Sequence, residues 1–434
     1  MDPTEAVGVR VDDIRVEDSP DGGGRVRLAA EVSYDAATRG PETLWYEVSA
    51  TLAGDLSRTG NPWVAALLPV AATLGEDLDV DAPVDASLLD GASRLLHIWA
   101  DWFAFTSVVA IRCAEVTAVR APGPGLTASF FSGGLDSSYT ALSRRPLDEL
   151  IFIGGFDLPL ASSQAIAEVR HSLEETAVAL GIPLVFVRSN WRETQASEVD
   201  WELVGHGALL ASIALALEGR YGRVHIPTSA WKDDHWPWGS DPRTDPLLST
   251  QRLTLRHDGV SLDKHERAAV VAASDVAREH LRVCWRSGDA TNCGRCVKCR
   301  LTMLDLEVLV GLDRCPTFPA RGLSLGDVRR LRVDAPWGLR RLLACREQAH
   351  RGGRTDLARA IDCAVRRSRH MSRWNSRIHR IRRGALGRAR VFPLLGALRS
   401  GFVPAPAGWP CRLEGTDYPD GRGFPAHTRS ASLP

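Results

Sequence analysis

One short segment limits the possible folds of this 434-residue chain more than any other: Ser132-Gly133-Gly134-Leu135-Asp136-Ser137-Ser138. It follows an apolar run at 128–131, which predicts a buried strand, and it precedes a helical stretch. Glycines permit positive φ and close backbone approach to a ligand, and N–H groups at a helix start bind anions. The carboxylate of Asp136 adds nothing to an anion site unless it holds Mg²⁺ between phosphates. The segment therefore predicts a phosphate-binding turn between a strand and a helix.

Short apolar strands alternate with helical stretches after this turn. The predicted strands are 128–131, 150–153, 183–187 and 223–226, and the predicted helices are 137–143, 163–180 and 207–217. This alternation predicts an α/β fold with a doubly wound parallel sheet that is covered on both faces.

The rest of the chain divides into further predicted domains. Residues 1–120 predict a separate α+β domain of unknown role, because strands at 7–11, 26–32, 43–48 and 107–116 accompany helices at 62–74 and 86–102. The Pro- and Gly-rich residues 121–125 break both helix and strand and separate it from an α/β domain at 126–283. A cysteine-rich segment at 284–312, a helical, Arg-rich region at 313–400 and a flexible tail at 401–434 are predicted to follow.

The nine cysteines include a cluster of four: Cys284, Cys293, Cys296 and Cys299. Two interlocked Cys-x2-Cys steps allow several thiolates to meet at one ion, and four thiolates form the closed tetrahedral set of structural zinc. An iron–sulfur cluster is the alternative, although its usual fourth cysteine lies downstream rather than upstream. The spacing predicts a Zn²⁺ site.

The phosphate turn resembles the Ser-Gly-Gly-x-Asp-Ser signature of the N-type ATP pyrophosphatase superfamily. This resemblance implies an adenine nucleotide alpha hydrolase-like fold, ATP and Mg²⁺ as cofactors, and a loop that holds the β,γ-pyrophosphate. It implies catalytic roles for Ser132, Asp136 and Ser137, and ATP contacts from residues 132–138 together with Phe156 and Asp157 after the second strand. Members of the superfamily adenylate an oxygen atom, and a nitrogen or sulfur nucleophile then displaces AMP.

The combination of this turn with the cysteine spacing resembles 7-cyano-7-deazaguanine synthase over residues 126–303. That family converts a carboxylate to a nitrile with ammonia. The segments expected to contact the substrate differ from the corresponding segments of that family; they are 154–159, 204–207 and 233–242. We therefore expect an ATP-dependent ligase that acts on a different small-molecule carboxylate and forms an amide or nitrile with ammonia or an amine.

Polar and aromatic side chains in the divergent segments are the candidates for binding substrate. They are His206, Lys232, Asp234, Trp236, Trp238 and Asp241. Flat apolar surfaces beside charges suit a planar polar ligand. A packed loop corner is the alternative for the tryptophan-rich stretch, and a helix cap or a packed side chain is the alternative for His206.

Three other functions remain open from the sequence: an RNA sulfur-transfer enzyme of the same superfamily, an inactive nucleotide-binding scaffold, and non-enzymatic RNA binding through the Arg-rich tail. The arginines between 366 and 390 lie in a stretch with no acidic residue from Asp362 to Glu414, which suits RNA or an anionic surface as well as a solvated helix. Replacing Asp136 with Ala is expected to abolish pyrophosphate release and to leave folding nearly normal.

The expected location is the cytoplasm. The sequence shows no export signal and no run of roughly 18 apolar residues, and its formal net charge is zero. A homo-oligomer is the expected assembly.

Overall fold

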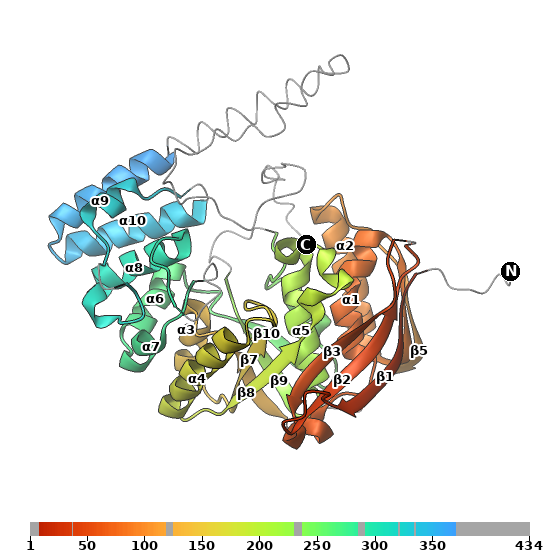
Figure 1. Cartoon of the computed structure of the whole chain (residues 1–434). Helices are drawn as coiled ribbons and strands as arrows, with labels where there is room; N and C mark the ends of the chain where they lie inside the picture. The colour runs from red at the N-terminus through yellow and green to blue at the C-terminus, as the bar shows by residue number, and fades with distance from the viewer. Residues whose placement is uncertain are drawn as a thin grey trace, which may run out of the picture. The chain divides into compact units, whose positions relative to one another are not determined.

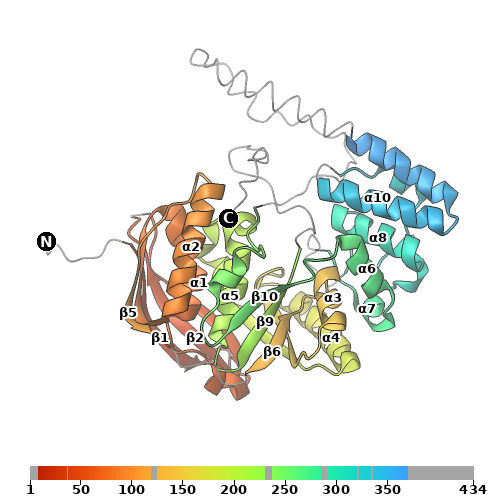
Figure 2. The same cartoon turned by 180° about the vertical axis from the view of Figure 1, so that it is seen from behind.

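The computed structural model describes residues 8–36, 38–118, 125–229, 237–284, 291–319, 322–333 and 336–369. The chain divides into two compact units, which are residues 1–293 with 305–322, and residues 294–304 with 323–434. Figure 1 and Figure 2 show the chain from opposite sides.

The described part of the first unit contains a ten-stranded sheet with the order β10-β9-β6-β7-β8-β3-β2-β1-β4-β5. The pairings β8–β3, β3–β2 and β2–β1 are antiparallel, and the others are parallel. The strands are β1 (Gly8–Asp18), β2 (Arg25–Ser33), β3 (Glu42–Ser49), β4 (Asp77–Asp85), β5 (Ile111–Thr117), β6 (Leu126–Phe130), β7 (Glu149–Gly154), β8 (Leu184–Ser189), β9 (Tyr221–Pro227) and β10 (Thr254–Asp258). The predicted α/β class is confirmed, and the sheet is mixed but mostly parallel.

Helices connect these strands and continue into the second unit. They are α1 (Asn61–Leu74), α2 (Ala86–Trp102), α3 (Leu135–Ser143), α4 (Ser163–Leu180), α5 (His206–Ala216), α6 (Lys264–Ala272), α7 (Asp275–His280), α8 (Val297–Leu309), α9 (Leu325–Arg330) and α10 (Pro336–Arg351), and residues 355–369 are also helical. Shorter turns are η1 (Ala50–Asp55), η2 (Trp191–Glu193), η3 (Gln195–Glu198), the π-helical η4 (Trp201–Gly205), η5 (Asp245–Leu248) and η6 (Leu312–Arg314).

Two almost entirely buried helices, α1 and α5, form much of the core. They pack against each other, and α1 also packs against β1 and β4 (Figure 1 and Figure 2). Every residue from 207 to 216 is buried. A helix that is buried on all sides needs an apolar sequence all around, as α5 has.

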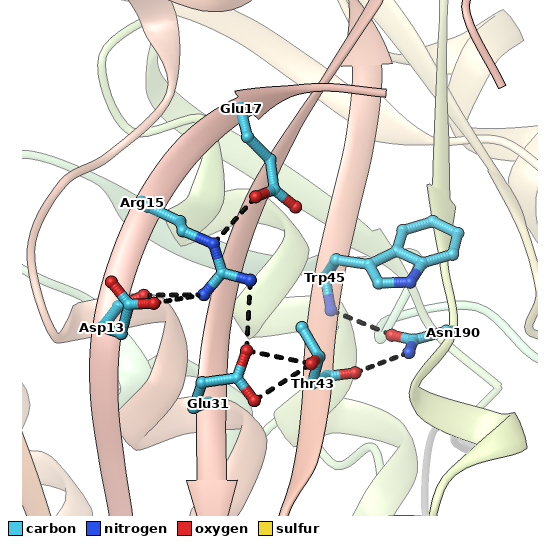
Figure 3. A network of polar contacts seen from close by, with 7 residues as sticks. All are labelled: Asp13, Arg15, Glu17, Glu31, Thr43, Trp45 and Asn190. Carbon is cyan, nitrogen blue, oxygen red and sulfur yellow. Dashed lines mark hydrogen bonds and ion pairs between the residues drawn. The ribbon is translucent and has the colours of Figure 1, made fainter. Parts of the chain in front are cut away.

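The predicted α+β and α/β domains share one sheet. Strand β3 pairs with β8, where Tyr46 lies opposite Ser189 and Glu47 opposite Arg188. The side chain of Asn190 strengthens this junction, since it accepts a hydrogen bond from the Trp45 N–H at 2.9 Å and donates to the Thr43 carbonyl at 2.8 Å (Figure 3). Residues 1–120 therefore extend the sheet that carries the phosphate turn.

A network of charges covers part of strands β1 to β3 beside this junction. Arg15 donates to Asp13 and Glu17 at 2.8 Å and to Glu31 at 3.1 Å, and Thr43 donates to Glu31 at 2.9 Å (Figure 3). The Arg15 side chain is 30% exposed, so each of these ion pairs stabilises the fold only weakly. We interpret this network as a solvated sheet face.

Candidate functional site

The phosphate turn lies at the carboxyl end of β6, where it connects that strand to α3. Gly133 has φ +72°, and a Cβ atom built on it would lie 2.7 Å from the Leu173 side chain, so a larger residue does not fit. Gly134 is the N-cap of α3 and provides no side-chain cap. The Ser137 hydroxyl closes the turn, because it donates to the Gly134 carbonyl and accepts from the Ser132 N–H. The turn has the shape of an anion site at a helix N-terminus.

Asp136 is held between two cations. Lys264 Nζ bonds one of its carboxylate oxygens, and Arg267 Nη1 lies 3.0 Å from the other. The Asp136 side chain is 21% exposed and that of Lys264 is 18% exposed, whereas the Arg267 side chain is completely buried. The two cations fix the position of the carboxylate beside the turn.

The positions of both cations follow from the start of α6. Asp263 caps this helix in a capping box with Glu266, which sets Lys264 at the first helical position. Arg267 also donates to the carbonyl of Thr228, directly after β9. Ends of β6 and β9 and the segment after β10 therefore meet at Asp136. The sequence analysis did not identify Lys264 and Arg267 as site residues. The signal that could have indicated Lys264 is the rarity of lysine, which occurs three times in the chain.

A second group of predicted residues lies after β7 and at the start of α5. The Phe156 ring packs edge-on against the Trp201 ring, with the ring centroids 5.3 Å apart. The His206 ring is tilted relative to the Trp201 ring, and their centroids are 5.2 Å apart. The Arg192 guanidinium lies over Trp201 at 4.3 Å, and Asp157 is exposed beside Phe156. Phe156 and His206, predicted for ATP and substrate respectively, thus belong to one aromatic cluster. Trp201 and Arg192 are members that the sequence did not indicate.

The remaining substrate candidates are placed only in part. Lys232, Asp234 and Trp236 lie outside the described residues, and Trp238 is partly buried. Asp241 is buried, and both of its carboxylate oxygens accept from Arg243, at 2.8 and 2.7 Å. The Asp241 carboxylate also accepts from the Arg243 N–H at 2.8 Å, so it orders its own loop.

The four predicted cysteines converge. The sulfur atoms of Cys284, Cys293, Cys296 and Cys299 all lie within 4.8 Å of one another, and all but Cys293 are buried. No described cysteine forms a disulfide. Four thiol groups at this separation fit a soft, tetrahedral ion, so the cluster can bind a metal such as zinc.

The asparagine before the second cysteine orders the approach to this cluster. Asn292 accepts from the N–H groups of Val283 and Cys284 at 2.9 and 3.1 Å, and it donates to the Leu281 carbonyl at 2.7 Å. Gly294 adopts φ +62°, which permits the tight turn between cysteines. Backbone hydrogen bonds to the segment before a ligand commonly fix the orientation of that ligand.

The predicted Arg-rich region and tail are described only up to residue 369. Arg366, Arg367 and Arg369 are exposed on the last described helix, and the other arginines of the stretch lie outside the described residues, as does the whole of 401–434. Within the described residues, no helix combines the length and apolar character that crossing a membrane requires.

No protein family, curated protein or solved structure matches this chain.

Proposed function

We propose that this protein is an ATP-dependent ligase that activates a small-molecule carboxylate as an acyl adenylate and joins it to ammonia or an amine. The observation that carries the proposal is the carboxylate of Asp136, held by Lys264 and Arg267 next to a glycine turn at a helix N-terminus. A carboxylate, two cations and a helix start without a side-chain cap, all at the carboxyl ends of parallel strands, suit a magnesium-bound polyphosphate.

The proposed reaction has two steps. A carboxylate oxygen of the substrate attacks the α-phosphorus of ATP, and pyrophosphate leaves with the electrons of the broken P–O bond. The nitrogen nucleophile then attacks the acyl carbon, loses a proton and expels AMP. In both steps the protein acts mainly by positioning and by neutralising charge.

The individual residues have distinct proposed roles in this reaction. Asp136 is the residue that would hold Mg²⁺, which supplies charge neutralisation when bound, and Lys264 faces the phosphates. The turn amides and Ser132, Ser137 and Ser138 hold the pyrophosphate. The cluster of Phe156, Trp201 and His206 is proposed to border the substrate or the adenine, since ligands bind at the carboxyl ends of parallel strands.

The cysteine cluster supports a ligase more than a sulfur-transfer enzyme. Its four sulfur atoms complete a closed donor set, so none of them is left to carry sulfur. Elemental analysis of anaerobically purified protein distinguishes the two functions. About one zinc per chain without visible colour supports the ligase, whereas iron with broad visible absorption favours sulfur transfer.

The proposal is tested first by equilibrium binding of ATP with Mg²⁺, which needs no knowledge of the substrate. Asp136→Asn should abolish magnesium-dependent binding. Asp55→Asn is the matched control, because Asp55 also pairs with an arginine, Arg220, at 3.0 Å and is similarly exposed. Binding that is unchanged in Asp136→Asn contradicts the assignment of the phosphate turn.

Turnover provides the second test. Wild-type protein is incubated with ATP, ammonium and mixtures of carboxylates, and the nucleotide products are separated. Equal amounts of AMP and pyrophosphate are expected. Release of ADP and phosphate instead would show a different mode of ATP cleavage.

A further inference from the structure

Arg282 has two buried guanidinium nitrogens that no part of the described chain satisfies. Its Nε and Nη2 atoms are both enclosed without a hydrogen-bond partner. Arg278 and Arg300 also have such a nitrogen, but only one each. A guanidinium does not lose its charge in a protein, so enclosed donors without an acceptor destabilise the fold unless a ligand supplies one.

The backbone of Arg282 is attached to the phosphate turn. Its N–H donates to the Gly133 carbonyl at 2.9 Å. A Cβ atom built on Gly133 would lie 3.9 Å from the Arg282 Cβ, and one built on Gly134 would lie 3.7 Å from the Arg282 carbonyl oxygen. The backbone of Arg282 therefore lies beside both glycines of the turn, and its side chain begins next to Gly133.

The other arginine at this site has acceptors within the protein. Arg267 donates to Asp136 and to the carbonyls of Thr228 and Asp263. Arg267 thus serves to hold Asp136, and its charge is already matched by a carboxylate. Arg282, whose backbone lies beside the turn, has two enclosed donors without such an acceptor.

The segment that carries Arg282 is clamped on both sides. Asn292 bonds the backbone of Leu281, Val283 and Cys284. On the other side the Gly133 carbonyl accepts from Arg282 itself. These hydrogen bonds fix the backbone of Arg282 relative to the turn before any ligand binds. Less conformational entropy is then lost when a ligand binds.

We propose that Arg282 is a binding residue for the terminal phosphates of the nucleotide, in addition to Lys264. Its paired N–H groups match two phosphate oxygens, which a lysine at this place cannot do. This inference rests on the proposed function, and it gives that site a second phosphate-binding cation.

The test is calorimetric titration with magnesium pyrophosphate, together with the melting temperature of the unliganded protein. The variants are Arg282→Met, Arg282→Gln and Arg282→Lys. The control is Arg252→Met, because the guanidinium of Arg252 donates to the carbonyls of Glu218 and Gly219 and not to the turn.

We expect Arg282→Met and Arg282→Gln to weaken pyrophosphate binding by about 10- to 150-fold, the range for hydrogen bonds to a charged group. Arg282→Lys should fall between these variants and the wild type, and Arg252→Met should bind like the wild type. The melting temperature of unliganded Arg282→Met should be equal to or higher than that of the wild type, because the substitution removes enclosed donors without partners.

Three outcomes overturn the inference. If the wild type binds pyrophosphate and Arg282→Met binds it equally well, the inference fails while the proposed function stands. If Arg282→Met and Arg282→Gln both melt well below the wild type, Arg282 has a structural role instead. If the wild type itself does not bind magnesium pyrophosphate, the proposed function fails and the inference with it.

Discussion

Removal of the Asp136 carboxylate should destabilise the protein as well as inactivate it. Arg267 Nη1 lies 3.0 Å from Asp136 Oδ1, and the Arg267 side chain is fully buried. Loss of one partner of a buried ion pair costs about 3–5 kcal/mol. Here Asp136 is partly exposed and Arg267 keeps the carbonyls of Thr228 and Asp263 as acceptors, so about 2 kcal/mol is expected for Asp136→Ala. The sequence analysis predicts nearly normal folding for the same variant, so the measured loss of stability distinguishes the two expectations.

The measurement is the free energy of unfolding from urea denaturation, followed by tryptophan fluorescence. Asp136→Asn keeps an acceptor for Arg267 and should lose only about 1 kcal/mol. A double-mutant cycle with Arg267→Met should give a coupling energy of about 1–3 kcal/mol. Glu174→Ala is the control, because Glu174 pairs with Arg170 on the surface and should change stability by less than about 0.5 kcal/mol. Additive effects of Asp136→Ala and Arg267→Met would refute the reasoning.

Three further perturbations test other parts of the molecule. Burial lowers the pKa of His225 despite the opposing charge of Asp258, so the unfolded chain binds the proton more tightly than the folded chain. Stability should therefore fall as the pH drops below about 6.5. In urea titrations, His225→Gln should reduce this dependence of stability on pH. Cys299→Ser should reduce the zinc content and lower the melting temperature, as measured by elemental analysis and calorimetry. Gly155→Ala should lower the free energy of unfolding by more than about 3 kcal/mol, because the new Cβ would lie 2.1 Å from the Ser189 carbonyl oxygen. Gly181 also has a positive φ but open space around it, so Gly181→Ala should cost about 1 kcal/mol in the same denaturation experiment.

Periodicity predicted most of the elements of the first unit but missed two strands. The predicted helix at 86–102 agrees with α2, and its N-cap Asp85 is visible in the sequence. Strand β4 was missed because aspartates occupy alternate positions, although Leu78 and Val80 between them are fully buried. Strand β10 is short, and its polar sequence carries little apolar signal. The pairing of β3 with β8 depends on backbone groups, which leave no pattern in the side chains.

The candidate site was only half visible in the sequence for a related reason. The phosphate turn and the cysteine cluster are local patterns, so their spacing alone indicates their chemistry. Lys264, Arg267 and Arg282 are well over a hundred residues from the turn along the chain, and only the fold brings them to it. The same limit applies to Trp201, whose ring contacts come from three different segments.

The contacts of residues 39–45 give a physical reason for the N-terminal strands. Both carboxylate oxygens of Glu42 accept backbone N–H groups, from Gln195 at 2.8 Å and Ala196 at 3.1 Å. Arg39 donates to the Gln195 carbonyl at 2.7 Å and pairs with Glu198. The segment between β8 and α5 carries Arg192 and leads to Trp201 in the aromatic cluster. The N-terminal strands therefore order one wall of the candidate site.

Glu42→Ala should consequently loosen this wall without disturbing the phosphate turn. The two hydrogen bonds that join this segment to the Glu42 carboxylate are lost, so local opening at 190–198 should become easier by about 2–4 kcal/mol. Hydrogen exchange read by mass spectrometry should show faster exchange at 190–198 and unchanged exchange at 126–143. Glu31→Ala is the control, because Glu31 lies in the neighbouring strand β2 and its carboxylate accepts from Arg15 and Thr43. Equal exchange at 190–198 in Glu42→Ala and wild type would mean that the segment is held by its own packing and that the N-terminal strands have another purpose.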